Sequence, residues 1–231
     1  MRPMTSILTC AAIMLSVSAA QATTLNFLGF TDAKGETAVE GFFTNGTIHD
    51  ATYVPIAVTA RGYKGDTKNG VESDKYFAYL DRNQAGLGVC KVLRGSQCKT
   101  PSDDNLTRGE ILGLSFAEDV TIGALSFRGD KHPSDKAFGE NDKFNFSLDG
   151  GKNWMSTFLL NARFGGSVPL NALLPKGDEL LLAYNNQQYY LSAMTVETTP
   201  APVPLPAAGA LLIAAFGGLG LMGARRRRMT A

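Results

Sequence analysis

The chain has 231 residues, of which 22 are Lys or Arg and 21 are Asp or Glu, and its formal net charge at pH 7 is +1. Five of the basic residues lie near the termini, Arg2 and Arg225 to Arg228, so the remainder holds 17 basic against 21 acidic residues and a charge near −4. Nucleic-acid binding needs a basic face, and this balance argues against nucleic acid as a partner.

The first 22 residues have the three parts of a secretory signal peptide. Arg2 supplies the positive charge, an apolar run extends over residues 7–20, and the small-residue triplet Ala20-Gln21-Ala22 follows. We therefore expect signal peptidase to cleave after Ala22 and the protein to be exported. Cys10 lies within the apolar run and would be removed with it.

Short segments of alternating apolar and polar residues fill the middle of the chain, and turn-forming residues separate nearly all of them. Alternation with a period of two is typical of half-buried strands. The sequence predicts an all-β ectodomain over residues 23–199, an antiparallel β-sandwich of jelly-roll type. The expected strands are residues 25–30, 39–44, 53–62, 75–81, 109–116, 120–127, 143–149, 154–160, 180–184 and 189–197.

Cys90 and Cys98 are the two cysteines that remain after removal of the signal peptide. An even number of cysteines in an oxidising compartment is usually paired. A metal site would need further Cys or His residues nearby, and the sequence has none there. We therefore expect a disulfide between Cys90 and Cys98.

Motifs of the common enzyme classes are absent from the sequence, so no catalytic residue is assigned. There is no G-x-S-x-G elbow, no H-E-x-x-H, no P-loop and no G-x-G-x-x-G after a strand. The two histidines, His49 and His132, are expected in loops. Hydrolysis by paired carboxylates stays an alternative, because their separation in space cannot be read from a sequence.

One oxygen-rich segment is the best candidate metal site. Calcium prefers carboxylate and amide oxygens, which are supplied by Asp103, Asp104, Asn105 and Glu110. Asp and Asn also favour turns because they hydrogen-bond their own backbone, and the spacing is not that of an EF-hand. A structural calcium ion and a plain turn therefore both stay open, and no other cofactor is expected.

Residues 147–154 resemble the Asp-box pattern S-x-D-x-G-x-T-W, with Asn153 in place of the usual Thr. In that pattern the Asp ties a hairpin turn and the Trp packs beneath it. Sialidases carry several copies, and one imperfect copy implies a β-hairpin only. Trp154 has two interpretations, a core residue or a platform on which a sugar ring stacks. An alternative aromatic patch consists of Tyr184, Tyr189 and Tyr190.

Residues 200–231 combine prolines, an uncharged segment at about 207–224 and a cluster of four arginines, Arg225, Arg226, Arg227 and Arg228. As a helix, residues 205–224 would span roughly 30 Å, about one hydrocarbon core. The arginines are expected on the cytoplasmic side of the inner membrane, which places the ectodomain outside. A permanent membrane anchor is the simplest interpretation of this segment.

The tail also has a motif that an anchor does not require. The order of Val203-Pro204-Leu205-Pro206-Ala207, an apolar helix and a terminal Arg cluster resembles the VPLPA variant of the PEP-CTERM sorting signal of Gram-negative bacteria. The resemblance implies processing by an exosortase-type enzyme and delivery to the cell surface or the exopolysaccharide matrix. Residues 86–90, 103–107 and 109–110, with Cys98, resemble one group of β-sandwich surface proteins whose ectodomains precede this signal.

These observations predict a non-enzymatic surface or extracellular-matrix protein that is first made as an inner-membrane-anchored precursor. Its expected partners are signal peptidase, the exosortase-type enzyme, the inner membrane transiently, and exopolysaccharide. Two alternatives stay open: a carbohydrate-binding module of the same fold, and a secreted polysaccharide hydrolase.

Overall fold

The computed structural model describes most of the region between the two terminal segments. The described residues are 21–29, 37–38, 41–44, 56–81, 85–99, 104–129, 138–159 and 167–198. Residues 1–20 of the predicted signal peptide and both histidines lie outside them. Among the residues described, no helix is long and apolar enough to cross a membrane.

The whole predicted sorting signal, residues 200–231, also lies outside the described residues. The expectations for it therefore stay predictions. They concern the motif residues Val203, Pro204, Leu205, Pro206 and Ala207 and the tail arginines Arg225, Arg226, Arg227 and Arg228.

The described chain consists of β-strands, turns and one short 3-10 helix, as the period-two alternation predicts. The elements are β1 (Gln21–Asn26), η1 (Phe27–Gly29), β2 (Thr37–Ala38), β3 (Gly41–Thr44), β4 (Ala57–Asp66), β5 (Gly70–Asp81), β6 (Gly86–Cys90), β7 (Leu93–Arg94), β8 (Gln97–Cys98), β9 (Glu110–Phe116), β10 (Val120–Gly129), β11 (Lys143–Ser147), β12 (Met155–Phe158), β13 (Ser167–Leu174), β14 (Glu179–Tyr184) and β15 (Tyr189–Thr198).

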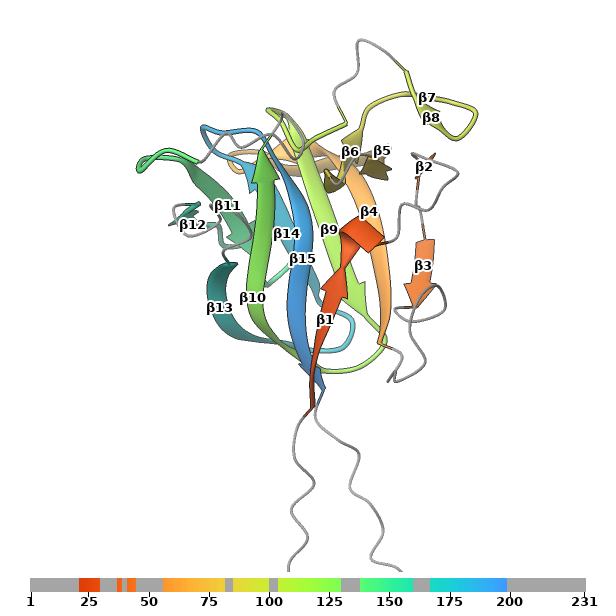
Figure 1. Cartoon of the computed structure of the whole chain (residues 1–231). Helices are drawn as coiled ribbons and strands as arrows, with labels where there is room; N and C mark the ends of the chain where they lie inside the picture. The colour runs from red at the N-terminus through yellow and green to blue at the C-terminus, as the bar shows by residue number, and fades with distance from the viewer. Residues whose placement is uncertain are drawn as a thin grey trace, which may run out of the picture. The chain divides into compact units, whose positions relative to one another are not determined.

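Ten strands form one antiparallel path that closes nearly into a barrel (Figure 1). Its order is β12-β11-β14-β9-β4-β5-β6-β15-β10-β13, and β1, β2 and β3 pair with β15, β5 and β4. Strands β7 and β8 make a separate two-stranded sheet. The prediction of an all-β, antiparallel domain is confirmed.

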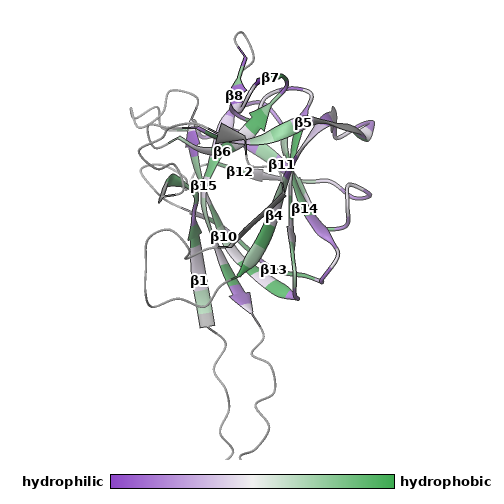
Figure 2. Ribbon diagram, turned by 90° about the vertical axis from the view of Figure 1, so that its right-hand side faces the viewer, coloured by the Kyte–Doolittle hydropathy of each residue, from purple (hydrophilic) through white to green (hydrophobic). Residues whose placement is uncertain are grey.

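One apolar cluster fills the interior, and most of the strands contribute to it. In β10, Ile122, Leu125 and Phe127 are buried, and a bulge after Ile122 shifts the alternation by one residue. The Phe127 ring centroid lies 4.6 Å from that of Phe144 and 5.1 Å from that of Tyr189. Burial of each large apolar side chain contributes roughly 1.5–3 kcal/mol. Figure 2 shows hydrophobic stretches along the strands and hydrophilic residues at several turns.

Two strands of the main path, β6 and β13, are missing from the sequence prediction. In β6 the glycines weaken the strand pattern, but a side chain at Gly88 would collide with the carbonyl oxygen of Asp104. In β13 a proline, Pro169, argues against a central strand. The structure accommodates Pro169 because β13 is the last strand of the path and pairs only with β10.

The first and last strands of the compact unit Gln21–Thr199 are neighbours in the sheet. Strand β1 pairs with β15 so that Gln21 lies opposite Thr198, and the start of β1 is next to the end of β15 (Figure 1). Cleavage after Ala22 would leave residues 23–26 of β1 paired with β15.

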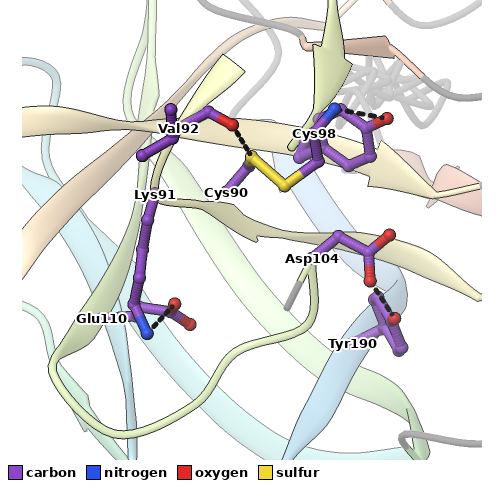
Figure 3. Close-up of a disulfide and its surroundings, with 8 residues drawn as sticks. Cys90, Lys91, Val92, Cys98, Asp104, Glu110 and Tyr190 are labelled. Carbon is purple, nitrogen blue, oxygen red and sulfur yellow. Dashed lines mark hydrogen bonds and ion pairs between the residues drawn. A yellow bond between two sulfur atoms is a disulfide. The ribbon is translucent and has the colours of Figure 1, made fainter. Parts of the chain in front are cut away.

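The predicted disulfide is present, with Cys90 Sγ and Cys98 Sγ 2.03 Å apart. Cys90 ends β6 and Cys98 ends β8, so the bond fastens the small β7–β8 hairpin to the main sheet (Figure 3). The Cys98 backbone N–H also donates to the hydroxyl of Tyr79 at 3.2 Å, and Tyr79 is fully buried. The hairpin is thus attached to β5 as well as to β6.

Replacing Cys90 and Cys98 together by Ser should lower the free energy of unfolding by at most about 2.5 kcal/mol, because the closed loop is short. Urea denaturation of the exported protein would measure the change, and the reduced wild type should unfold like the variant. A variant that unfolds at the urea concentration of the oxidised wild type would contradict the stabilising role.

Candidate functional site

The carboxylates of the predicted calcium site are directed toward different partners (Figure 3). Asp104 Oδ1 accepts a 2.7 Å hydrogen bond from the Tyr190 hydroxyl. Glu110 forms a 3.1 Å ion pair with Lys91, and its other oxygen accepts from the Thr107 N–H at 2.7 Å. The structure therefore does not turn Asp104 and Glu110 toward a common point.

Of the other two residues of the predicted calcium site, only Asn105 lies within the described residues. Asn105 is buried, and its Oδ1 accepts no hydrogen bond from a described residue, whereas Asp103 lies outside the described residues. In the part of the chain that the structure describes, no three His, Cys, Asp or Glu side chains gather as metal ligands. The calcium ion stays a prediction.

The Tyr190 hydroxyl lies between two carboxylates, those of Asp104 and Asp81. Burial and then the nearby carboxylates raise the pKa of Tyr190 well above its usual value, so the phenol stays protonated and donates. Tyr189 and Tyr190 are 0% and 1% exposed. The alternative aromatic surface patch is therefore wrong, because both rings are interior groups.

The Asp-box-like segment forms the turn between β11 and β12, so the predicted hairpin is confirmed. Asp149 accepts hydrogen bonds from the Asn153 backbone N–H at 3.0 Å, the Asn153 amide at 2.6 Å and the Ser147 hydroxyl at 2.7 Å. These bonds, with that from the Asn153 backbone the strongest cause, lower the pKa of Asp149 to about 2. The turn is thus built around an ionised carboxylate, and Asn153, which stands in place of the usual Thr, supplies two of its hydrogen bonds.

Trp154 packs on the outer face of the sheet, away from the main cluster. Its neighbours there form a small apolar group of Tyr63, Ile111, Leu181 and Ala183. The indole Nε1 is buried and has no hydrogen-bond partner among the described residues. This position agrees with packing beneath the turn, and a glycan contact at Trp154 stays a prediction.

Beside this group, a cleft of about 630 Å³ opens on the same outer face. One wall is formed by the neighbouring strands β11, β12 and the end of β14. The other wall consists of the β4–β5 turn and residues 108–110, which a 3.1 Å hydrogen bond from Gly65 N to Gly109 O joins. Clefts of this volume are common ligand sites in proteins.

Three polar side chains on the first wall form a connected network. Asn145 Oδ1 accepts from the Ser156 hydroxyl at 2.5 Å and from the Asn185 amide at 2.8 Å. Asn145 Nδ2 donates to the Tyr184 carbonyl at 2.9 Å, which fixes the orientation of the amide. Asn145 is 7% exposed and Ser156 is exposed, so the network extends from a buried side chain to one that solvent or a ligand can reach.

Charged residues of both signs line the cleft. The Asp66 carboxylate accepts 2.8 Å hydrogen bonds from the backbone N–H groups of Asn69 and Lys68, and these bonds lower its pKa. Glu110 is ion-paired as described above. The Lys68 and Arg108 side chains are exposed and form no salt bridge with any residue that the structure describes. Neither cation is held in an ion pair within the described chain, although the Lys68 charge contributes to the lowered pKa of Asp66.

The sequence pointed to two residues of this cleft, Glu110 as a calcium ligand and Tyr184 as part of an aromatic patch. It did not predict the hydrogen-bond network of Asn145. Asn145 lies between Phe144 and Phe146, and that alternation predicts an outward side chain at Asn145. Nothing in the sequence pairs Asn145 with Ser156, which is opposite it in the hairpin. Comparisons of the chain with protein-family models, curated proteins and solved structures find no match.

The Asp149 turn makes the stability of the hairpin depend on pH. The pKa of Asp149 is lowered in the folded state, so its contribution is present above the usual value of 3.8 and is lost as the pH falls through about 2. We expect Asp149→Asn to lower the melting temperature at neutral pH, and this difference from wild type to shrink between about pH 4 and pH 2. Asp178→Asn, at an exposed turn position, is the matched control. A constant difference across that range would contradict the role of the ionised form.

Proposed function

We propose that this protein is an exported, non-enzymatic surface or extracellular-matrix protein that is delivered through an exosortase-type sorting signal. The observation that carries the proposal is the order of motif, apolar segment and Arg cluster in residues 203–228. The disulfide between Cys90 and Cys98 supports it, because disulfides persist in oxidising compartments outside the cytoplasm. In this proposal the precursor is held briefly in the inner membrane before it reaches the surface.

We also propose that the ectodomain is a β-sandwich of jelly-roll type. Support comes from two sets of strands that contribute to one apolar cluster, β5-β6-β15-β10-β13 and β4-β9-β14-β11-β12. The register between β4 and β5 shifts twice between Gly62 and Gly65, and such irregularities are where a path bends from one layer to another.

The electrostatics of the cleft favour binding over hydrolysis. Glycoside hydrolysis needs a protonated carboxylic acid opposite an ionised carboxylate. In the cleft the pKa of Asp66 is lowered, and Glu110 is held by Lys91. Burial raises the pKa of the Glu179 carboxyl, but Glu179 accepts from Tyr63 at 3.0 Å and does not line the cleft.

Replacing Pro204 and Pro206 by Ala should leave an uncleaved form in the inner membrane of the native host. Membrane insertion depends on length and hydrophobicity, which hardly change, whereas a sorting enzyme must read the motif. Mass spectrometry of the mature wild type should find a chain without the arginines at 225–228. A wild-type protein that still ends at Ala231 in the inner membrane would leave a plain anchor as the explanation.

A second candidate function is carbohydrate binding, and the cleft is the observation that favours it. Its first wall presents two amides and a hydroxyl, which are complementary to the hydroxyl groups of sugars. The small apolar group beside the cleft gives the site little hydrophobic surface of its own. A hydroxyl-rich ligand therefore fits this lining better than an apolar one.

Ser156→Ala should weaken retention on immobilised polysaccharide about fivefold, since one net hydrogen bond contributes about 1 kcal/mol. Asn185→Ala should have a similar effect. Ser167→Ala is a matched control, because Ser156 and Ser167 are both exposed and lie on the two strands that end the sheet path. Equal retention of all three variants and wild type would exclude the cleft as the sugar site.

A further inference from the structure

The two walls of the cleft present different chemistry to a ligand. The network wall offers neutral donors and acceptors from Asn145, Ser156 and Asn185. The opposite wall carries the exposed side chains of Lys68 and Arg108. A ligand that meets both walls therefore has hydroxyl groups on one side and a negative charge on the other.

The anions of the cleft neutralise only part of this positive charge. The Asp66 carboxylate accepts from two backbone N–H groups and from the Asn69 amide at 3.1 Å, so it is held within its own turn. Glu110 is buried, and Lys91, which does not line the cleft, balances it. Lys68, Arg108 and Lys91 together carry one charge more than Asp66 and Glu110, so the local charge is near +1, although the region between the terminal segments is near −4.

The network also has capacity for further hydrogen bonds. Asn145 uses its Oδ1 twice and donates from Nδ2 to the Tyr184 carbonyl. The Asn185 amide donates to Asn145 Oδ1, and its own Oδ1 accepts no hydrogen bond from any described residue. That oxygen lies at the cleft wall, where a sugar hydroxyl can donate to it.

The position of Arg108 is set by its surroundings. The following residue, Gly109, has a positive φ of 83° and accepts from Gly65 N at 3.1 Å. On the other side of Arg108, the Thr107 N–H donates to Glu110 Oε2 at 2.7 Å. The Arg108 backbone is therefore held between two anchored residues while its side chain stays free to form paired hydrogen bonds with a carboxylate.

We infer that the cleft selects acidic saccharides: Arg108 and Lys68 bind the carboxylate of a hexuronate unit, and the network of Asn145, Ser156 and Asn185 binds its hydroxyls. The inference rests on the proposed carbohydrate-binding function of this cleft and adds the class of sugar. Its ligand in the proposed setting is an exopolysaccharide that contains uronic acids.

Tetragalacturonate and its fully methyl-esterified form test the inference, because they share every hydroxyl and differ in charge. Calorimetry with the exported protein should show tighter binding of the acid than of the ester. Arg108→Gln and Lys68→Gln should each weaken binding of the acid about tenfold and affect binding of the ester far less. Lys176→Gln removes the same charge at an exposed turn outside the cleft and should have no effect.

The possible results separate the inference from the function on which it rests. Equal binding of acid and ester, unaffected by Arg108→Gln, would overturn the charge selection and leave carbohydrate binding intact. Loss of acid binding in Lys176→Gln to the same extent would show general charge attraction and would also overturn it. Binding of neither sugar, with wild-type melting temperatures in all variants, would overturn both proposals.

Discussion

Tyr189 and Tyr190 are consecutive residues of one strand, both are almost fully buried, and each needs a partner for its hydroxyl. Tyr189 points into the main cluster and donates to the Ala183 carbonyl at 3.1 Å, on the strand that supplies one wall of the cleft. Tyr190 points to the opposite face and donates to Asp104 at 2.7 Å, at the start of the segment that supplies the other wall. One strand thus holds a residue close to each wall, while the pairing of β14 with β9 and of β9 with β4 joins the two walls directly.

The same strand holds the segment that leads to Arg108. Leu106 N donates to the Tyr189 carbonyl at 2.8 Å, and the amide of Gln188, just before β15, donates to the Thr107 hydroxyl at 2.9 Å. The segment also needs Gly88, since any Cβ there would occupy the space of the Asp104 backbone. A substitution at Gly88 is therefore a change to the cleft as well as to β6, because it displaces the chain that carries Arg108. If the cleft binds the proposed saccharide, stability and ligand specificity are coupled at this point.

The sequence predicted what local patterns determine. Alternation predicted strands at β9, β10, β11, β14 and β15, and the Asp-box resemblance predicted the β11–β12 hairpin, because both depend on neighbours in the chain. The disulfide could be predicted because Cys10 lies in the predicted signal peptide, so Cys90 and Cys98 can pair only with each other. The cleft could not be predicted, because Asn145 and Asn185 are 40 residues apart and meet only through the register of β11 with β14. The aromatic patch was wrong for a related reason: the periodicity shows that Tyr189 and Tyr190 point to opposite faces, but it does not show that both faces are covered.

The place of β15 in the sheet also constrains how the domain forms. It is the last strand of the described chain, yet it pairs with β10 along one edge and with β1 and then β6 along the other. These contacts join residues far apart in sequence, and such topologies fold slowly because long loops must close first. The neighbours of β15 keep unpaired edges until it arrives, and unpaired edges favour aggregation. In the proposed pathway the strand is delivered just ahead of the membrane segment. The sheet would then be completed at the outer side of the membrane, away from the cytoplasm, where Cys90 and Cys98 can also be oxidised.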